Sequence, residues 1–561
     1  MKKLRWQLII IFLTGLVVGI LLLGEQPLIT PMFRPQPVQG GVYTEALIGS
    51  MQRLDPVMDF YNRVDRDVDR LIFSQLIRFD ERGLPQPDLA ESWGISKDGT
   101  IYNFTIRSNV RWHDGEPLTS GDVIFTIGLL QEGGETIPGD LQAFWGEIEV
   151  KFLDETNLQF HLPYAFAPFL DYLTFGVLPK HLLGDLSFEQ LADSPYNLQP
   201  VGSGPFKFSH LITEEDLITG VVLSAFEAYY GKEPFIEQIT FVYYPDHNAA
   251  LQAYRDNEVQ GISEVAVGIL PDVLGEEDLA LYTGRMPEIS MVLLNLQNPE
   301  VPFFLETSVR KALLYGINRQ WMIDRLLMGQ AVMTDSPILP GTWAYYDGLV
   351  RIDYDPDRAR NLLRESGYVV PADGELVREK EETQVRFTLL YPDDDAHEQL
   401  VEVIQSNWLA LDIAVEIEPV PYDQLINERL EQRDYQAALV DLNLARTPDP
   451  DPYPFWNQLQ AIGGQNYSQW DHRMASEYLE QARVENDLVE RKRLYHNFQV
   501  IFNQEMPALP LFYPVYTYAV DRQVLGVKMG PLFESSDRFA MILEWYMEAR
   551  LPTAQSSPPG E

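Results

Sequence analysis

The sequence contains no cysteine in its 561 residues. This absence excludes disulfide bonds, thiolate metal sites and cysteine nucleophiles, and it also excludes a lipid attached to a cysteine near the amino terminus. With 45% hydrophobic and 12% aromatic residues, the chain is long enough for roughly three to four domain-sized units. Its stability must therefore come from hydrophobic cores alone.

Basic residues are also scarce, because 42 Lys and Arg stand against 83 Asp and Glu, for a formal net charge of -41. A surface of this sign repels nucleic acid and anionic lipid headgroups. We therefore expect no nucleic-acid partner. Net charge alone does not fix the charge of a ligand, since the sign of a binding cleft is a local property.

Sequence motifs of catalysis are missing too. There is no Gly-x-Ser-x-Gly nucleophile elbow, no His-Glu-x-x-His zinc motif and no Walker motif, and the 8 His residues are dispersed without metal-ligand spacing. Paired carboxylates are abundant in so acidic a chain and discriminate nothing. We expect a protein that is not an enzyme, with no catalytic residues, no metal site and no cofactor. A secreted hydrolase is the least favoured alternative.

The amino terminus combines positive charge with a long apolar run. Lys2, Lys3 and Arg5 precede the apolar residues 8–23. With its flanking residues this run is about 27 Å long as a helix at ~1.5 Å per residue, just enough to cross a bilayer. The charges place the tip in the cytoplasm and the rest of the chain outside. A cleaved signal peptide is the alternative, but residues 24–27 make a poor cleavage site, so we expect an uncleaved anchor.

Residues 87–123 carry the most specific pattern of the chain, PDLAESWGISKDGTIYNFTIRSNVRWHDGEPLTSGDV. After a turn at residues 97–100, apolar residues alternate with polar ones as in a half-buried strand, at Tyr102, Phe104 and Ile106. A second turn follows at residues 113–115, and the polar residues 119–122 predict a helix N-terminus. For His113 we expect a hydrogen-bonded scaffold role rather than a metal or catalytic one.

This pattern resembles the signature of the family 5 extracellular solute-binding proteins of ABC importers, which include oligopeptide, dipeptide and nickel receptors. The resemblance implies an α/β, two-lobed periplasmic-binding-protein-like fold with a hinge and an extra subdomain inserted in the first lobe, preceded by an N-terminal transmembrane segment. Such a protein binds a peptide-like solute between its lobes and delivers it to the permease, whose ATPase subunits are separate chains. A ligand sensor for a signalling partner is the main alternative.

The same resemblance divides the chain into successive segments: 1–24 N-terminal transmembrane anchor or signal, 25–41 linker, 42–290 lobe 1 with the inserted subdomain at about 66–195, 291–505 lobe 2, 506–550 return to lobe 1, and 551–561 disordered tail. Two crossings between the lobes, at residues 286–293 and 504–513, would form the hinge. We expect a monomer, anchored to the cell membrane by its N-terminal helix and exposed at the cell surface or in the periplasm.

Local patterns predict further elements. The helical stretch at residues 68–77 resembles the family's opening. Hydrophobic periodicity indicates a helix at residues 309–319. Helix-strand alternation then predicts a helix at residues 398–409 and a strand at residues 413–417. Asp355 is expected to cap another helix, with Pro356 at its first position and Gly367 as its terminator. The sequence Gly-Ser-Gly-Pro at residues 202–205 lacks the Lys of a P-loop, and we interpret it as a turn.

Residues 435–456, YQAALVDLNLARTPDPDPYPFW, resemble the family's strand that enters the interlobe cleft and ends in an Asp-Pro loop. Residues 466–471 resemble its cleft-side segment, where Tyr and Trp bury large area and still offer a polar group. The resemblance thus implies these ligand-binding candidates: Asp441, Arg446, Asp449, Trp456 and Tyr467. A proline-stiffened surface loop is the alternative for residues 449–452.

Arg446 departs from the family pattern. Peptide-binding relatives carry an acidic residue shortly before the Asp-Pro loop, where it pairs with the free amino group of the peptide. If the strand alternates regularly, Asp441 points to the face opposite that of Arg446. An Arg446 that faces the cleft would favour a carboxylate or another acidic group, whereas the alternative is an arginine that neutralises Asp449 and Asp451. The sequence leaves the solute open among peptides, metal complexes, haem and sugars.

Overall fold

The computed structural model of the chain describes residues 37–80, 83–134, 137–372, 376–443, 448–530 and 532–547. Residues 39–547 form one compact unit. Nearly all of residues 1–38 and 548–561 lie outside the described ranges. The predicted anchor and tail are therefore not described. Within the described ranges, no helix is both long enough and apolar enough to cross a membrane.

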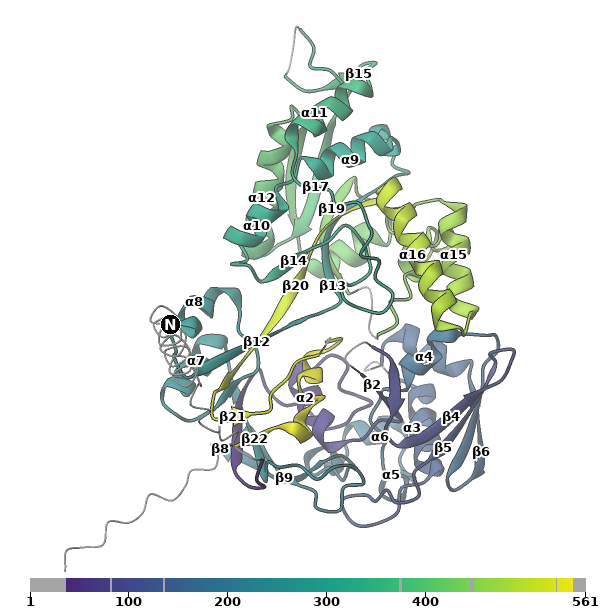
Figure 1. The fold of residues 1–561 in the computed structure, drawn as a ribbon, viewed down its shortest axis with the longest axis vertical. Helices are drawn as coiled ribbons and strands as arrows, with labels where there is room; N and C mark the ends of the chain where they lie inside the picture. Colours follow the sequence, from purple (N-terminus) through teal and green to yellow (C-terminus); the bar gives the residue numbers. More distant parts are fainter. Residues whose placement is uncertain are drawn as a thin grey trace, which may run out of the picture. The chain divides into compact units, whose positions relative to one another are not determined.

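A sheet of twelve strands runs through the described part of residues 39–547 (Figure 1). Its main path has the order β18 (Ala414–Val420), β17 (Arg386–Pro392), β19 (Ala437–Asn443), β13 (Glu288–Leu294), β20 (Ala508–Asp521), β11 (Gly261–Ile262), β1 (Val42–Ile48), β10 (Gln238–Tyr244), β9 (Leu217–Ala225) and β8 (Phe206–Glu214). Two more strands, β12 (Leu279–Arg285) and β14 (Ala331–Met333), pair with β20.

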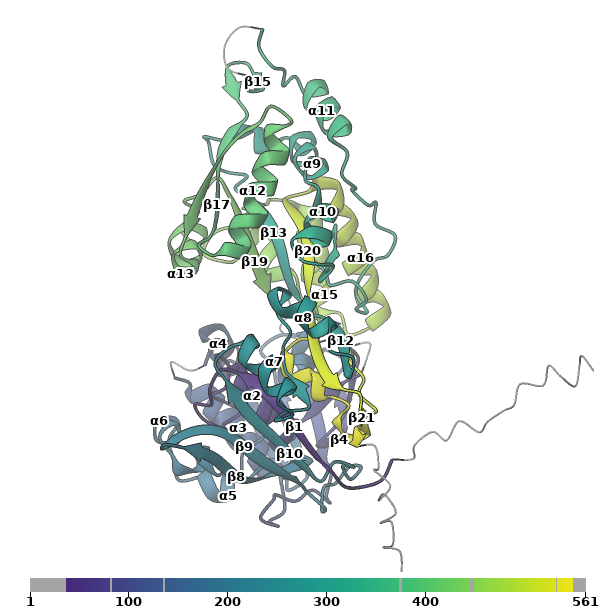
Figure 2. The same ribbon diagram turned by 90° about the vertical axis from the view of Figure 1, so that its left-hand side faces the viewer.

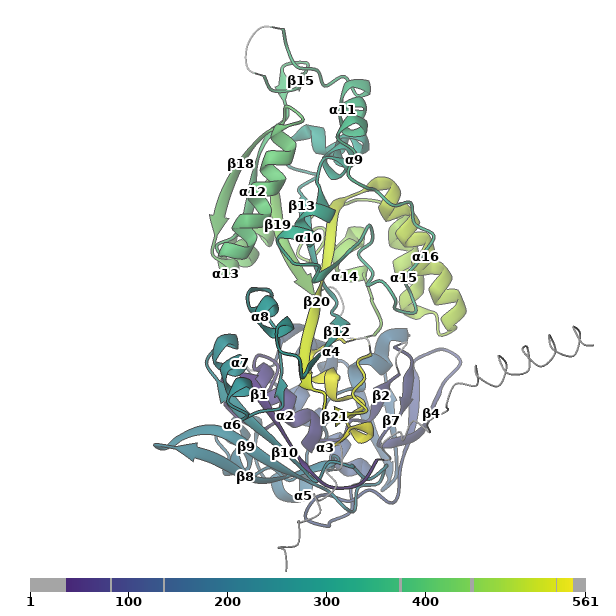
Figure 3. The ribbon, with the colours of Figure 1, turned by 60° about the vertical axis from the view of Figure 1, so that its left-hand side comes forward.

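Strand β20 belongs to both lobes, and Figures 2 and 3 show it passing from one into the other. Its first half pairs antiparallel with β13, and its second half pairs with β11 and β12. Almost every residue of β20 is buried, as expected for a central strand. Pro510 has no N–H to donate, and the register with β13 shifts between Ser290 and Met291, where Pro510 lies opposite.

Separate hydrophobic cores lie on the two sides of this junction. Buried residues between Ile289 and Tyr513 form the core of lobe 2, whereas the core of lobe 1 combines residues 43–241 with residues 516–545. A smaller cluster surrounds α7 (His247–Arg255) and α8 (Leu270–Leu274). The change of core within β20 supports a lobe boundary there, and the predicted domain limits themselves stay a prediction.

The run at residues 87–123 forms part of a second sheet in lobe 1, with the order β4 (Ala90–Ile95), β5 (Ile101–Ile106), β7 (Asn157–His161) and β6 (Glu149–Asp154). Tyr102, Phe104 and Ile106 are buried, so the predicted alternation is confirmed. Helix α3 (Ser120–Glu132) begins at the predicted N-terminus, where Asp122 accepts a hydrogen bond of 2.8 Å from the Thr119 N–H.

His113 connects the second predicted turn to the Gly-Ser-Gly-Pro turn. Its Nδ1 accepts from the Gly202 N–H at 3.1 Å, and its Nε2 lies 3.0 Å from the Gly204 carbonyl oxygen. Burial lowers the pKa of His113 to about 4, so the ring is neutral and donates through Nε2. A side chain at Gly202 would overlap the carbonyl oxygen of Ile72, which explains the glycine. These contacts agree with the scaffold role predicted for His113.

The helix predicted at residues 68–77 is wrong in its bounds. Helix α2 spans Arg63–Ile72, because the Asn62 side chain accepts from the Val64 N–H at 3.0 Å and starts the helix earlier. Its C-cap residue Phe73 is extended, and Ile77 already belongs to the short strand β2 (Ile77–Phe79), which pairs with β3 (Pro85–Pro87).

Helices cover the sheet of lobe 2, namely α9 (Thr307–Tyr315), α10 (Arg319–Arg325), α11 (Pro356–Glu365), α12 (Asp395–Leu409), α15 (Arg473–Val484) and α16 (Leu488–Glu505). The predicted start of α11 is confirmed, since Asp355 accepts from the Arg358 N–H at 2.8 Å. Gly367 follows its end with φ +91, as expected for a glycine terminator. The predicted run 309–319 divides at Gly316 into α9 and the start of α10.

Candidate ligand-binding cleft

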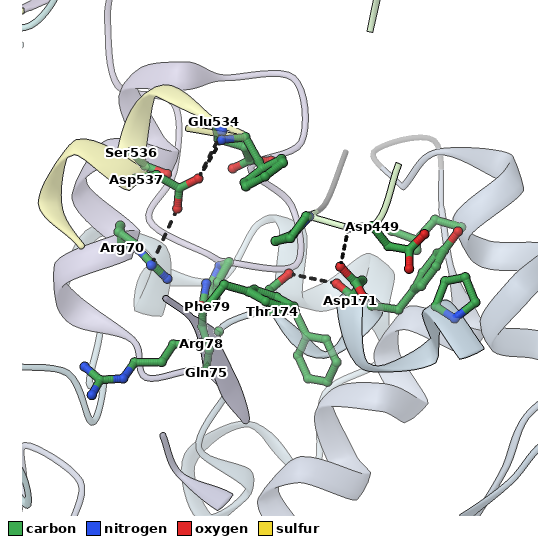
Figure 4. Close-up of a pocket in the computed structure, with 18 of the residues that line it drawn as sticks. Arg70, Gln75, Arg78, Phe79, Asp171, Thr174, Asp449, Glu534, Ser536 and Asp537 are labelled. Atoms are coloured by element: carbon green, nitrogen blue, oxygen red, sulfur yellow. Dashed lines mark hydrogen bonds and ion pairs between the residues drawn. The ribbon is translucent and has the colours of Figure 1, made fainter. Parts of the chain in front are cut away.

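A cleft of about 1680 Å³ lies between the lobes, and Figure 4 shows some of the residues that line it. Lobe 1 supplies most of the wall, from α2, β2, β3, η1 (Ala167–Leu173) and the C-terminal segment with η7 (Ser535–Phe539). Aromatic rings such as Phe79, Phe144, Tyr164 and Tyr172 line it. The volume exceeds the roughly 300–1,000 Å³ typical of small-molecule pockets, so an extended solute has room.

One wall of the cleft is built from ion pairs between α2 and the C-terminal segment. Arg66 lies 3.4 Å from Glu534. Arg70 lies 3.6 Å from Asp537, as Figure 4 shows. Asp537 also accepts from the Glu534 N–H at 3.1 Å, which fixes the acidic side of the wall. The arginine side chains are 20% and 19% exposed, so a solute can still reach them. The wall offers both donors and acceptors.

Behind this wall, the fully buried Arg538 holds the two elements together. Its guanidinium lies 2.8 Å from both carboxylate oxygens of Asp67 on α2 and 2.7 Å from Glu45 on β1. Glu45 also accepts from the Tyr43 and Tyr518 hydroxyls at 2.6 and 2.7 Å. Burial disfavours the charged guanidinium, but Asp67 and Glu45 outweigh it and raise the pKa of Arg538. The network fixes the spacing of α2 and η7.

Four carboxyl groups gather around the start of α2. Burial raises the pKa of Asp55 to about 7 and that of Asp65 to about 6, and it raises the pKa of Asp59 and Asp69 well above the ordinary value. Asp69 lines the cleft, and neither of its carboxyl oxygens has a hydrogen bond of ordinary geometry. The nearby backbone N–H of Asp55 lowers the pKa of Asp69, but burial raises it more. This side of the cleft is therefore less negative than its composition indicates.

The lobe 2 wall includes the loop at residues 448–452. The Asp449 carboxylate is buried, pairs with Arg491 of α16 and accepts from the Tyr495 hydroxyl at 3.0 Å. Asp451 pairs with Arg483 of α15 at 2.6 Å. The predicted Asp-Pro loop thus faces the cleft with its two carboxylates held from behind by arginines.

The sequence candidates take different places. Asp449 lines the cleft, and Arg446 lies outside the described residues. Asp441 on β19 does not line the cleft. Its carboxylate accepts from the Ser290 hydroxyl and lies 3.2 Å from Nε2 of His397. The structure therefore separates Asp441 from Asp449, and its ligand role stays a prediction.

Trp456 and Tyr467 are buried in the core of lobe 2 and do not line the cleft. The Trp456 ring packs edge-on against Phe502 at 4.8 Å, and Arg433 stacks over the Tyr467 ring at 5.1 Å. Packing within lobe 2 covers both rings. Their ligand role also stays a prediction.

Sequence reasoning missed the lobe 1 residues of the cleft, such as Arg70, Asp171 and Asp537. These residues are far apart in the chain, and only folding of α2, η1 and η7 around one space brings them together. The run RVDRDVDR in α2, with its alternating charges, could have indicated a site here. Burying several carboxyl groups on one helix is costly, so such a helix is more typical of a binding site than of a simple core.

Comparison with known proteins decides the family. The profile of the bacterial extracellular solute-binding proteins, family 5 Middle, matches residues 85–465. The chain belongs to this family. As a family 5 solute-binding protein it is a receptor of an importer, it acts outside the cytoplasm, and it is not an enzyme. In the described part of the chain, no cluster of His, Asp and Glu is arranged to hold a metal ion.

Relatives of this solute-binding protein share most of its length. It is 25% identical over 466 residues to the dipeptide-binding protein of Escherichia coli (strain K12), which covers 80% of this chain and 84% of that protein. It is 26% identical over 475 residues to the nickel-binding periplasmic protein of the same strain, covering 81% and 86%. The structure of HbpA2 from Haemophilus parasuis superposes with a TM-score of 0.79 at 20% identity, covering 91% of this chain and 100% of that one. The chain has the α/β, two-lobed periplasmic-binding-protein-like fold.

Proposed function

We propose that this family 5 receptor binds a peptide-like solute between its lobes and delivers it to the permease of an ABC importer, whose ATPase subunits are separate chains. The observation that carries the proposal is the cleft of about 1680 Å³, whose walls combine aromatic rings with the ion pairs of Arg66 and Arg70. A peptide offers main-chain donors and acceptors together with apolar side chains, and such a wall satisfies both. The similarity to the dipeptide-binding protein supports this solute class.

The protein would work as a monomer that opens and closes about its crossing strands. Strand β20 and the connection from β12 to β13 pass between the lobes, so a small rotation there changes the width of the cleft. A solute that contacts both lobes binds the closed form better and shifts the equilibrium toward it. The closed receptor would then present a defined surface to the permease. Residues 1–24 would keep the receptor at the membrane as an uncleaved anchor.

Among the candidates, Arg446 is the residue that we propose to set the charge of the solute, and Asp449 of the loop at residues 448–452 is a second ligand residue. Asp441, Trp456 and Tyr467 stay in the proposal as ligand residues of lobe 2, from the resemblance alone. An arginine at position 446 favours a solute with a carboxylate or another acidic group, because its planar donors form a bidentate pair. A peptide presented by its carboxyl end would meet this requirement.

The experiment is a thermal melt of the purified full chain with a synthetic pool of di- to pentapeptides. A ligand at ~100 times its Kd adds about 2.7 kcal/mol to the free energy of unfolding. Arg446→Ala should lose most of this gain while its ligand-free melt stays nearly unchanged. The control is Arg429→Ala, which removes an exposed arginine of the same lobe that pairs with Asp434 at 3.0 Å.

Two results would change the proposal. A lower ligand-free melting temperature of Arg446→Ala would assign Arg446 to neutralising Asp449 and Asp451. If the peptide pool leaves the melt unchanged while a nickel complex, haem or a sugar raises it, the peptide assignment is wrong.

A further inference from the structure

The loop at residues 448–452 is held from within lobe 2 by the buried guanidinium group of Arg491 and the half-buried one of Arg483. Arg491 of α16 pairs with Asp449, lies 5.2 Å from the Trp343 ring centre and donates to the Ala482 carbonyl at 3.0 Å. Arg483 of α15 makes a two-pronged pair with Asp451, with distances of 2.6 and 2.9 Å. Charge-assisted pairs are stronger than neutral hydrogen bonds, and the buried Arg491–Asp449 pair is also shielded from water.

The same loop touches lobe 1 at η1. The Asp449 N–H donates to the Asp171 carboxylate at 2.8 Å, and Figure 4 shows these two residues side by side in the cleft. The Arg483 guanidinium lies 5.5 Å from the ring centre of Phe166, the residue just before η1. Asp171, Asp449 and Arg491 are 7%, 3% and 6% exposed, so solvent screens this contact little.

Charge links the three residues across the lobes. Burial disfavours the charged form of Arg491, but Asp449 and, less strongly, Asp171 outweigh it, so the pKa of Arg491 is raised. One cation thus faces a carboxylate from each lobe. Separating the lobes would remove Asp171 from Arg491 and break the hydrogen bond from the Asp449 amide, whereas the Arg491–Asp449 pair would remain within lobe 2.

We propose that Asp171, Asp449 and Arg491 form an interlobe latch in which Arg491 is the positioning residue: it fixes Asp449 so that the loop docks on Asp171 of lobe 1. The latch raises the closed fraction of the receptor before any solute arrives and so sets its apparent affinity. The effect on apparent affinity rests on the proposed function. The effect on the closed fraction does not, because that fraction is measurable without a ligand.

The experiment measures the distance between the lobes in the ligand-free full chain. The sequence has no cysteine, so Leu217→Cys in lobe 1 and Leu409→Cys in lobe 2, at residues 69% and 66% exposed, accept two spin labels specifically. Asp171→Ala should add a longer interlobe distance that the parent lacks. It removes the lobe 1 partner and leaves the Arg491–Asp449 pair in place, so lobe 2 stays intact. Arg491→Met should add the same longer interlobe distance. Arg491→Lys keeps the positive charge and should return part of the distance distribution to the short distance of the parent.

The matched control is Arg310→Met in lobe 2. Arg310 is 3% exposed, donates to the Phe304 and Met506 carbonyl oxygens at 2.6 and 2.9 Å, and does not line the cleft. Its replacement should lower the melting temperature and leave the interlobe distance unchanged. This result separates the latch from a general loss of stability.

Affinity gives the second measurement. With the synthetic pool of di- to pentapeptides, Asp171→Ala should weaken binding by about tenfold, because a charge-assisted hydrogen bond of the closed form is lost. An unchanged distance distribution in Asp171→Ala, with the chain folded by circular dichroism, overturns the latch whether or not peptides bind. A parent protein that binds no peptide, but opens in Asp171→Ala, supports the latch and contradicts the proposed solute.

Discussion

Arg538 of η7 and Glu45 of β1 form a buried ion pair of 2.7 Å. These two elements lie near the last and the first residues of the described chain, so the pair joins segments that are far apart in the sequence. Asp67 of α2 completes the network. Arg538→Met would leave Glu45 and Asp67 buried without their cation, and we expect the free energy of unfolding to fall by about 3–5 kcal/mol. Urea unfolding followed by tryptophan fluorescence measures the loss.

The control for Arg538 is an exposed pair. Arg351 lies 2.6 Å from Asp353, with 61% and 68% of their side chains exposed, and Arg351→Met should cost no more than about 1 kcal/mol. Similar losses for the two variants would mean that Arg538 contributes no more than a surface arginine, and the account of the lobe 1 wall would be wrong.

The carboxyl of Asp55 predicts an unusual pH dependence. Burial raises its folded pKa from 3.8 to about 7, so the native state binds this proton more tightly than the unfolded chain. The stability that it contributes is complete below about pH 4 and is lost as the pH rises toward 7. Asp55→Asn keeps an acceptor for the Val57 N–H, which lies 3.0 Å from Asp55 Oδ1, and should be free of this loss.

Melting curves from pH 4 to pH 8 test this expectation. Relative to the parent, Asp55→Asn should gain stability as the pH rises, by at most about 4 kcal/mol, since one pKa unit corresponds to about 1.4 kcal/mol. Asp98→Asn is the control, because hydrogen bonds from Ser96 and Thr100 lower the pKa of that exposed carboxyl. Between pH 5 and pH 8 the stability of Asp98→Asn should change with pH as that of the parent does. If the stability of Asp55→Asn also follows the parent over this range, the raised pKa of Asp55 is contradicted.

Gly202 is expected to tolerate no side chain. A Cβ there would overlap the backbone oxygen of Ile72 at the end of α2, so Gly202→Ala should cost about 1–3 kcal/mol through forced backbone movement. Gly268→Ala is the matched control, because its Cβ would meet no atom within 4 Å. Thermal unfolding of both variants gives the comparison, and equal melting temperatures would refute the close approach.

Local chemistry explains which parts of the fold the sequence predicts. Asp355 with Pro356 and Gly367 marks both ends of α11, and the alternation of Tyr102, Phe104 and Ile106 marks a strand, because each signal acts within a few residues. The start of α2 was missed because Asn62 caps the helix ahead of its apolar residues. Its polar surface faces the cleft, so hydrophobic periodicity did not include it.

The cleft depends on long-range packing, which no short motif records. Asp449 was predicted from the resemblance at its Asp-Pro loop, but Asp171, its partner across the cleft, is 278 positions away. Trp456 was predicted from the same resemblance. A tryptophan suits a cleft and a core equally well, and in the structure Phe502 of α16 covers it.

The proposed anchor predicts the cell fraction that contains the protein and the residue at its mature amino terminus. Intact protein should remain with membranes through high salt and start at Met1 or Lys2, because residues 8–23 are apolar and residues 24–27 make a poor cleavage site. Amino-terminal sequencing of the membrane fraction checks this. A mature terminus between residues 24 and 41 would contradict an uncleaved anchor.

Native mass spectrometry of the purified full chain tests the central claim most directly. A solute receptor should carry a small molecule that leaves on denaturation, and fragmentation of that molecule should identify a peptide-like compound with a free acidic group. Protein that carries nothing, gains no mass with the peptide pool and shows no change in its melt would contradict the assignment of the cleft between Arg70 and Asp449 as a peptide site.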